Sequence, residues 1–111
     1  MATDRLRQLL TFLESSPKDS FLLFAIAKEY EGIGNLDIAL EYYQKLVARD
    51  PDYVGTYYHL GKLYESLEDP DKAFSTYRQG MDIAKKIGDR HALGELAEAK
   101  LMLGDDEDFE I

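Results

Sequence analysis

The chain of 111 residues contains no cysteine and no tryptophan, and only three prolines. Without cysteine there is no disulfide framework, no thiolate nucleophile and no cysteine-ligated zinc. Stability must therefore come from the packing of side chains, which fits a reducing cytoplasm. The length favours one small domain with its own hydrophobic core.

Basic side chains are scarce. The chain has 13 lysines and arginines against 22 aspartates and glutamates, and its net charge is -9. Nucleic-acid backbones and anionic membranes both bind clustered basic residues, so neither is expected as a partner.

Long hydrophobic runs are also missing. No segment approaches the roughly 20 apolar residues that a membrane span requires. The opening sequence MATDRLRQLLTFLESS lacks the uninterrupted apolar stretch of a signal peptide. We therefore expect a soluble, cytoplasmic protein.

The sequence is instead rich in helical patterns. Leu6, Leu9, Leu10 and Leu13 follow the spacing of one helix face, and no segment alternates with the period of a strand. The pattern predicts six helices with short connections. The first spans about 4–14, the second ends near 31, the third ends near 49, the fourth carries 57–64, the fifth spans 70 to about 87 and the sixth ends near 103.

Residues that break or cap helices stand between these segments. In the sequence GIGN, Gly32 or Gly34 can take the left-handed conformation that closes a helix, and Asn35 can cap the next. Asp69 and Pro70 suit a cap and a first helical position. Further along, "GDR" supplies a closing glycine at 88 and a capping aspartate at 89.

The chain repeats itself with a period of 34 residues. Small residues recur at Ala27 and Gly61 and at Ala39 and Ala73, where they let helix backbones approach closely. A pair of helices fits in 34 residues, and neither buries its apolar face alone, so the pairs must stack. The tyrosines expected to fill the space beside the small residues are Tyr30, Tyr64, Tyr43 and Tyr77.

The segments YHLGKLY with KAFSTY, and AIAKEY with IALEYY, resemble tetratricopeptide repeats in a small bacterial-type protein. The resemblance implies an all-α fold, a right-handed α-α superhelix of about six antiparallel helices. Departures are Leu23 and Tyr57 in place of the signature tryptophan, and Lys85 where a proline is expected. In the last helix Ala97 replaces the signature tyrosine, so this helix is expected to cap the stack.

On this basis residues 1–104 are predicted to form a single domain. Its parts are an N-terminal packing helix over 1–16, repeats over 17–50 and 51–87, a capping helix over 88–104, and an acidic tail over 105–111. The four leucines of the first helix should cover the open end of the first repeat. Removing residues 1–15 is therefore expected to abolish cooperative melting.

The resemblance also implies a protein-binding module without catalytic activity, in which a peptide or helix of a partner occupies a concave groove lined by the first helices. Aromatic rings beside lysines suit a ligand that combines an apolar side chain with a carboxylate. The lysines can equally be solvated residues paired with nearby glutamates. The predicted binding residues are Phe21, Phe24, Lys28, Tyr58, His59, Lys62 and His91. Three tyrosines are not required for packing, and of Tyr42, Tyr53 and Tyr58 we favour Tyr58 for ligand contact.

Other chemistries find little support. Two histidines, even with Glu95 four residues after His91, fall short of a metal site, and no glycine-rich phosphate loop follows a strand. We expect no catalytic residue, no cofactor and no metal. The main alternative is a structural protein that forms a homodimer through its terminal helices, and an undetected enzyme or small-molecule carrier ranks third.

The acidic tail has two interpretations. A short run of like charges normally stays solvated and disordered. The sharper hypothesis is that Phe109 and its acidic neighbours occupy a lysine-bearing aromatic groove of the same or a neighbouring chain.

Overall fold

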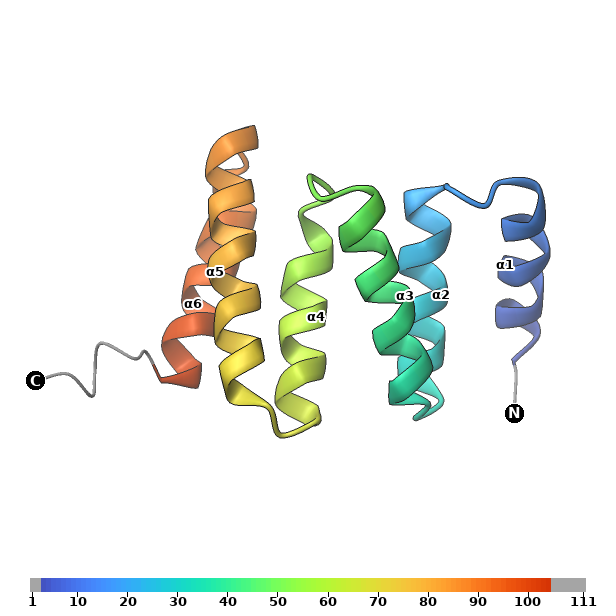
Figure 1. Cartoon of the computed structure of the whole chain (residues 1–111), viewed down its shortest axis with the longest axis horizontal. Helices are drawn as coiled ribbons and strands as arrows, with labels where there is room; N and C mark the ends of the chain where they lie inside the picture. Colours follow the sequence, from blue (N-terminus) through green and yellow to red (C-terminus); the bar gives the residue numbers. More distant parts are fainter. Residues whose placement is uncertain (1–2, 105–111) are drawn as a thin grey trace, which may run out of the picture. The chain divides into compact units, whose positions relative to one another are not determined.

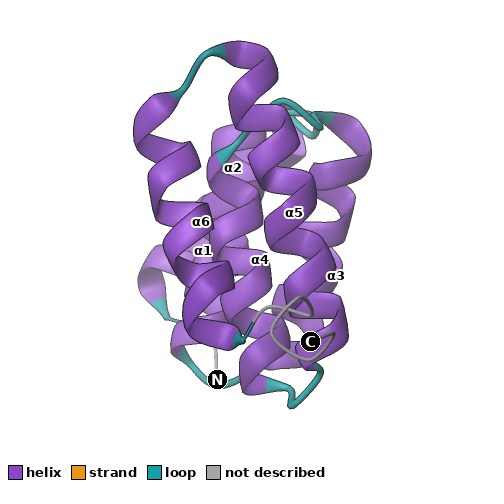
Figure 2. Cartoon of the chain, turned by 90° about the vertical axis from the view of Figure 1, so that its left-hand side faces the viewer, coloured by secondary structure: helices purple, strands orange, loops and turns teal. Residues whose placement is uncertain are grey.

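Six α-helices joined by short turns make up residues 3–104, the part of the chain that the computed structural model describes (Figure 1). No strand occurs within these residues, as the colouring by secondary structure shows (Figure 2). The all-α prediction with six helices is thus confirmed. The predicted acidic tail lies outside the described residues. The helices are α1 (Asp4–Ser15), α2 (Ser20–Gly32), α3 (Leu36–Arg49), α4 (Gly55–Ser66), α5 (Pro70–Ile87) and α6 (Arg90–Leu103).

The predicted caps begin and end these helices. The side chain of Asn35 accepts a hydrogen bond from the Ile38 amide at 3.4 Å and caps α3. Asp69 caps α5 in the same way, with Pro70 at the first helical position. Of the two glycines in GIGN, it is Gly34 that has a positive φ, of 84°.

The chain divides into two compact units, one reaching Tyr53 and the other starting at Val54. Each unit is a helical hairpin with one additional helix. That the two form a single domain over 1–104 stays a prediction.

In the first unit α2 packs against α3, and α1 packs on α2. Leu6 and Leu9 of α1 are buried against Ala25 and Ile26 of α2. The other two leucines of the predicted stripe are only partly buried at the edge of this cluster. The apolar face of α1 is thus part of the core of the first unit.

In the second unit α5 packs against α4 and against α6, and α4 and α6 also contact each other. A Cβ atom added to Gly61 would stand only 2.2 Å from Cε1 of Tyr77. Gly80 of α5, which the sequence analysis missed, is also tightly packed, because its Cβ would lie 2.5 Å from Cβ of Tyr57. The predicted role of small residues in close helix packing is confirmed at Gly61.

A tyrosine–glutamate hydrogen bond recurs in both units. The Tyr43 hydroxyl donates to Oε1 of Glu31 at 2.8 Å, and the Tyr77 hydroxyl donates to Oε2 of Glu65. Both tyrosine side chains are fully buried. The two glutamates thus satisfy the buried hydroxyl of the paired helix, a role that the sequence analysis did not predict.

Candidate functional site

Two predicted binding residues, Tyr58 and Lys62, lie one turn apart on α4 and line a hollow against α6. Nζ of Lys62 stands 5.6 Å from the centroid of the Tyr58 ring. The hollow has a volume of about 110 Å³, and we call it the α4–α6 hollow. It is lined by Tyr58, Lys62, Glu95, Glu98, Ala99 and Met102.

The charges around this hollow are mostly negative. Nζ of Lys62 lies 3.8 Å from Oε2 of Glu65, so the ammonium already has a carboxylate neighbour. The α6 side of the hollow adds the carboxylates of Glu95 and Glu98. The described lining therefore holds one lysine and two glutamates, with Glu65 beside the lysine, and the hollow offers an aromatic ring in an acidic setting.

The α6 side of the hollow was only partly predicted. The sequence predicted that the last helix continues the binding face with His91, Glu95 and Glu98, but it did not predict Ala99 and Met102. The signal was present in the spacing, because residues 95, 98 and 102 fall on one face of a helix. The Met102 side chain is 80% exposed and supplies apolar surface at the rim.

The two histidines stand next to the hollow rather than in its lining. The His59 ring contacts the Tyr58 ring edge-on, with centroids 5.4 Å apart. His91 is exposed, and its Nε2 lies 3.5 Å from Oε2 of Glu95. Both therefore adjoin residues that line the hollow.

The remaining predicted residues belong to α2 in the first unit. Phe21 is 58% exposed. Phe24 packs against the rings of Tyr43 and Tyr53, with centroids 6.3 and 5.9 Å away, and thus contributes to packing. Lys28 is partly buried. That Phe24 shares one binding surface with Tyr58 and His91 stays a prediction.

Burial raises the pKa of several tyrosines in the structure. For Tyr43 and Tyr77 burial is the largest cause of the raised pKa, and the hydrogen bond to a glutamate is the second. Burial also raises the pKa of Tyr42 and Tyr53, with a smaller contribution from nearby charged or ionisable groups. Tyr42 stacks on Tyr30 with centroids 5.8 Å apart. Tyr42 and Tyr53 thus serve packing, which leaves Tyr58 as the best of the three proposed ligand-contact tyrosines.

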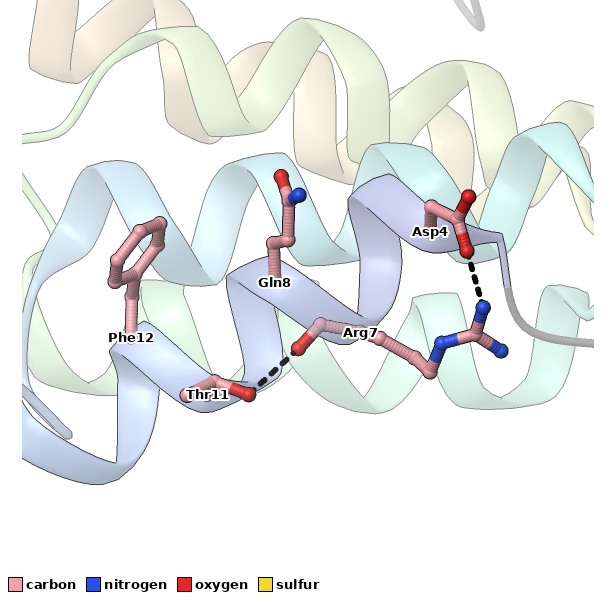
Figure 3. Close-up of a pocket in the computed structure, with 5 residues that line it drawn as sticks. All are labelled: Asp4, Arg7, Gln8, Thr11 and Phe12. Atoms are coloured by element: carbon pink, nitrogen blue, oxygen red, sulfur yellow. Dashed lines mark hydrogen bonds and ion pairs between the residues drawn. The ribbon is translucent and has the colours of Figure 1, made fainter.

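A larger hollow of about 370 Å³ lies on α1, but its described lining comes from that single helix (Figure 3). The polar groups there already bond to one another: Arg7 donates to the Asp4 carboxylate, and the Thr11 hydroxyl donates to the Arg7 carbonyl oxygen at 2.9 Å. We therefore regard this hollow as an ordinary helix surface.

Over residues 3–104 no group of three or more histidine, aspartate or glutamate side chains is placed to hold a metal ion. Nor is any helix in this range long and apolar enough to cross a bilayer.

Comparison with solved structures places the fold among known helical repeats. A tetratricopeptide repeat domain protein from Salinibacter ruber, solved by NMR, is 48% identical with a TM-score of 0.77 and covers 79% of this chain and 89% of its own. PcrH, solved in complex with the chaperone binding region of PopD, has a TM-score of 0.82 at 14% identity and covers 90% of this chain and 76% of its own. At such low identity the second match concerns the fold alone.

Sequence comparison identifies the repeats. A TPR repeat-containing protein of Pseudomonas aeruginosa is 31% identical over 78 residues, which are 70% of this chain and 74% of that protein. Residues 22–53 and 54–87 each match the family described as tetratricopeptide repeat. These matches begin a few residues later than the predicted repeats over 17–50 and 51–87. The chain belongs to the tetratricopeptide repeat family.

Proposed function

We propose that this protein is a non-catalytic protein-interaction module of the cytoplasm that binds a segment of another protein in the α4–α6 hollow. One observation carries the proposal: Tyr58 and Lys62, chosen for their place on the first helix of a repeat, line a hollow together with α6. An exposed methionine at the rim and an aromatic ring within reach are typical of surfaces that accept partner side chains.

The charge of the hollow indicates the kind of segment. Lys62 is close to Glu65, and two further glutamates line the α6 side. A carboxylate of a ligand would meet repulsion here, whereas a lysine or arginine would pair with Glu95 or Glu98 while its stem packs on Met102. We therefore propose a segment that combines a basic residue with an apolar one, in place of the carboxylate ligand suggested by the sequence.

Proteins of similar fold support a role in binding protein segments. PcrH was solved with the chaperone binding region of PopD, and SycD of Yersinia enterocolitica is described as a type III secretion translocator chaperone. Both share the fold at 14% and 12% identity, so the partners are not transferred. A small hollow of this kind favours a weak complex, in the micromolar range or about -8 kcal/mol.

A displayed library of short random peptides, selected on the full chain, tests the proposal. We expect the selected peptides to be enriched in basic and apolar residues. Tyr58→Ala should weaken their binding about tenfold or more, because it removes the aromatic contact. Phe12→Ala is the matched control, since Phe12 is an aromatic residue of α1 that is 60% exposed and lies in the other unit.

If Tyr58→Ala and Phe12→Ala lost peptide affinity to the same extent, or if neither lost any, binding at the α4–α6 hollow would be contradicted. A selection enriched in acidic peptides that still depends on Tyr58 would keep the site and overturn the proposed basic segment. A folded Tyr58→Ala variant, checked by circular dichroism, is required for either conclusion.

The alternative function, a homodimer formed through terminal helices, is favoured by a different observation. Leu101 and Met102 at the end of α6 are 66% and 80% exposed. Burying these side chains against a second copy would stabilise a dimer. Sedimentation velocity over a wide range of concentrations decides this: a sedimentation coefficient that rises with concentration, and stays low in Leu101→Glu, would support the dimer.

A further inference from the structure

A second hollow, between α5 and α6, has the opposite charge. It has a volume of about 230 Å³, and we call it the α5–α6 hollow. Arg78, Met81 and Lys85 belong to one face of α5, because their spacing is that of successive helix turns. The described lining is Arg78, Met81, Asp82, Lys85 and Lys100.

Cations from two helices meet at one aromatic ring beside this hollow. Nζ of Lys100 in α6 lies 4.8 Å from the centroid of the Phe74 ring, and Cζ of Arg78 in α5 lies 5.8 Å from it. The face of the ring attracts both cations and thereby holds two like charges close together. Lys85 adds a third cation, against the single carboxylate of Asp82 in the described lining.

A concentration of positive charge is unexpected in a chain with a net charge of -9. It creates a local field that favours an anionic occupant with several carboxylates. The apolar surface of Met81 in the same hollow favours an occupant that also carries an apolar side chain.

We propose that the α5–α6 hollow binds the chain's own residues 105–111. This segment has the sequence DDEDFEI, with five carboxylate side chains and the apolar residues Phe109 and Ile111. Its charge and its apolar residues are thus complementary to the hollow. The proposal does not depend on the proposed function, which concerns the other hollow.

The position of the segment in the chain favours this occupant over a free peptide. Residue 105 follows α6 almost directly, and Lys100 is in the last turn of that helix. Seven extended residues reach about 25 Å at most. The distance along α5 from Arg78 to Lys85 is only about 10 Å. Covalent attachment raises the effective concentration of the segment at the hollow, on the order of millimolar for short connections.

The absence of cysteine permits a direct test. A cysteine added after Ile111 leaves the segment intact and introduces the only thiol, to which a nitroxide spin label is attached. We expect the label to broaden the NMR amide signals of residues 78–85, and to do so less when the salt concentration is raised to about 0.5 M, because salt screens the charges.

Charge-neutralising variants provide the control. In the double variant with Arg78→Gln and Lys85→Gln, the amide signals of α5 should no longer be broadened. Lys72→Gln with Lys86→Gln removes the same number of charges from the same helix outside the described lining and should leave the broadening unchanged. Broadening confined to the last residues of α6, or equal in both double variants, would overturn the proposal.

A mixed sample identifies the source of the segment. Spin-labelled protein at natural isotope abundance is combined with ¹⁵N-enriched wild type, which has no thiol and carries no spin label. The proposal predicts no broadening of the enriched chain. Broadening of its residues 78–85 would assign the occupant to a second copy and would overturn binding within one chain.

Discussion

The hydrogen atom that serves as the side chain of Gly61 lets the Tyr77 ring pack directly on the α4 backbone. An added Cβ would stand 2.2 Å from Cε1 of that buried ring, closer than any van der Waals contact allows. At this scale one atom decides whether the two helices of the second repeat approach. Sequence comparison of the two repeats predicted the need for a small residue there, because Ala27 and Gly61 occupy equivalent positions.

Gly61→Ala is therefore expected to destabilise the protein. Displacing the ring costs about 1 to 3 kcal/mol, and the better helix propensity of alanine returns at most about 1 kcal/mol. Chemical denaturation of both proteins measures the difference in the free energy of unfolding.

Gly94→Ala is the matched control, since Gly94 lies in α6 with no atom within 4 Å of an added Cβ. There the change should raise the free energy of unfolding by about 0.5 to 1 kcal/mol. Equal effects of the two substitutions would show that the Tyr77 contact does not constrain position 61.

The buried tyrosine–glutamate pairs make stability sensitive to alkaline pH. Folding raises the pKa of Tyr43 and Tyr77 above the ordinary value of 10. Above about pH 10 the unfolded chain loses these protons while the folded chain keeps them, so the free energy of unfolding must fall as pH rises. The limiting slope is about 1.4 kcal/mol per pH unit for each tyrosine.

Urea denaturation as a function of pH, in the wild type and in Tyr43→Phe with Tyr77→Phe, tests this. The double variant is expected to lose stability less steeply above pH 10, although it is less stable at neutral pH by about 1 kcal/mol for each lost hydrogen bond. If the free energy of unfolding fell equally steeply above pH 10 in both proteins, the loss of stability at alkaline pH could not be assigned to these tyrosines.

At the scale of helices, α1 belongs to the core of the first unit although it precedes both matched repeats. Leu6 and Leu9 are buried on Ala25 and Ile26, while Phe12 on the same helix is exposed. The sequence predicted this face from the spacing of the leucines. It did not predict that Leu10 and Leu13 stay at the edge, because spacing fixes the direction of a side chain but not how far the partner helix extends.

Leu6→Ala should lower the free energy of unfolding by about 2 to 5 kcal/mol, since it leaves a cavity at a fully buried site. Phe12→Ala, in the same helix, should change it by less than about 0.5 kcal/mol. Thermal melting of the two variants distinguishes these expectations. A large loss of stability in Phe12→Ala would contradict this and would mean that the outer face of α1 is covered in the native protein.

Caps were the most predictable feature at this scale. Asp69 accepts a hydrogen bond from the Lys72 amide at 3.2 Å, and Asp89 accepts one from the Ala92 amide at 2.9 Å. Such caps are local, so a few residues of sequence contain all the information required. Asp69→Ala is expected to cost about 1 kcal/mol in denaturant unfolding, whereas Asp69→Asn retains an acceptor and should cost less. A loss as large in the asparagine variant would contradict the capping role.

For the molecule as a whole, the sequence predicted the helical class and the repeat but only part of the candidate site. Tyr58 and Lys62 were found because repeat position selects the exposed face of the first helix. Met102 and Ala99 were missed because they belong to α6, whose family signature is weak. Glu95 and Glu98 line the same hollow as Tyr58 and Lys62, so the carboxylate ligand expected from the sequence and the basic segment proposed from the structure are alternatives that a binding experiment decides.

The measurement that tests the central proposal most directly is an NMR titration of the full, ¹⁵N-labelled chain with the tightest peptide selected on it. Binding in the α4–α6 hollow predicts that the amide signals of residues 58–62 and 95–102 shift together and saturate with one dissociation constant. Shifts confined to α5, to α1 or to α2 would contradict the proposal and assign recognition to another surface.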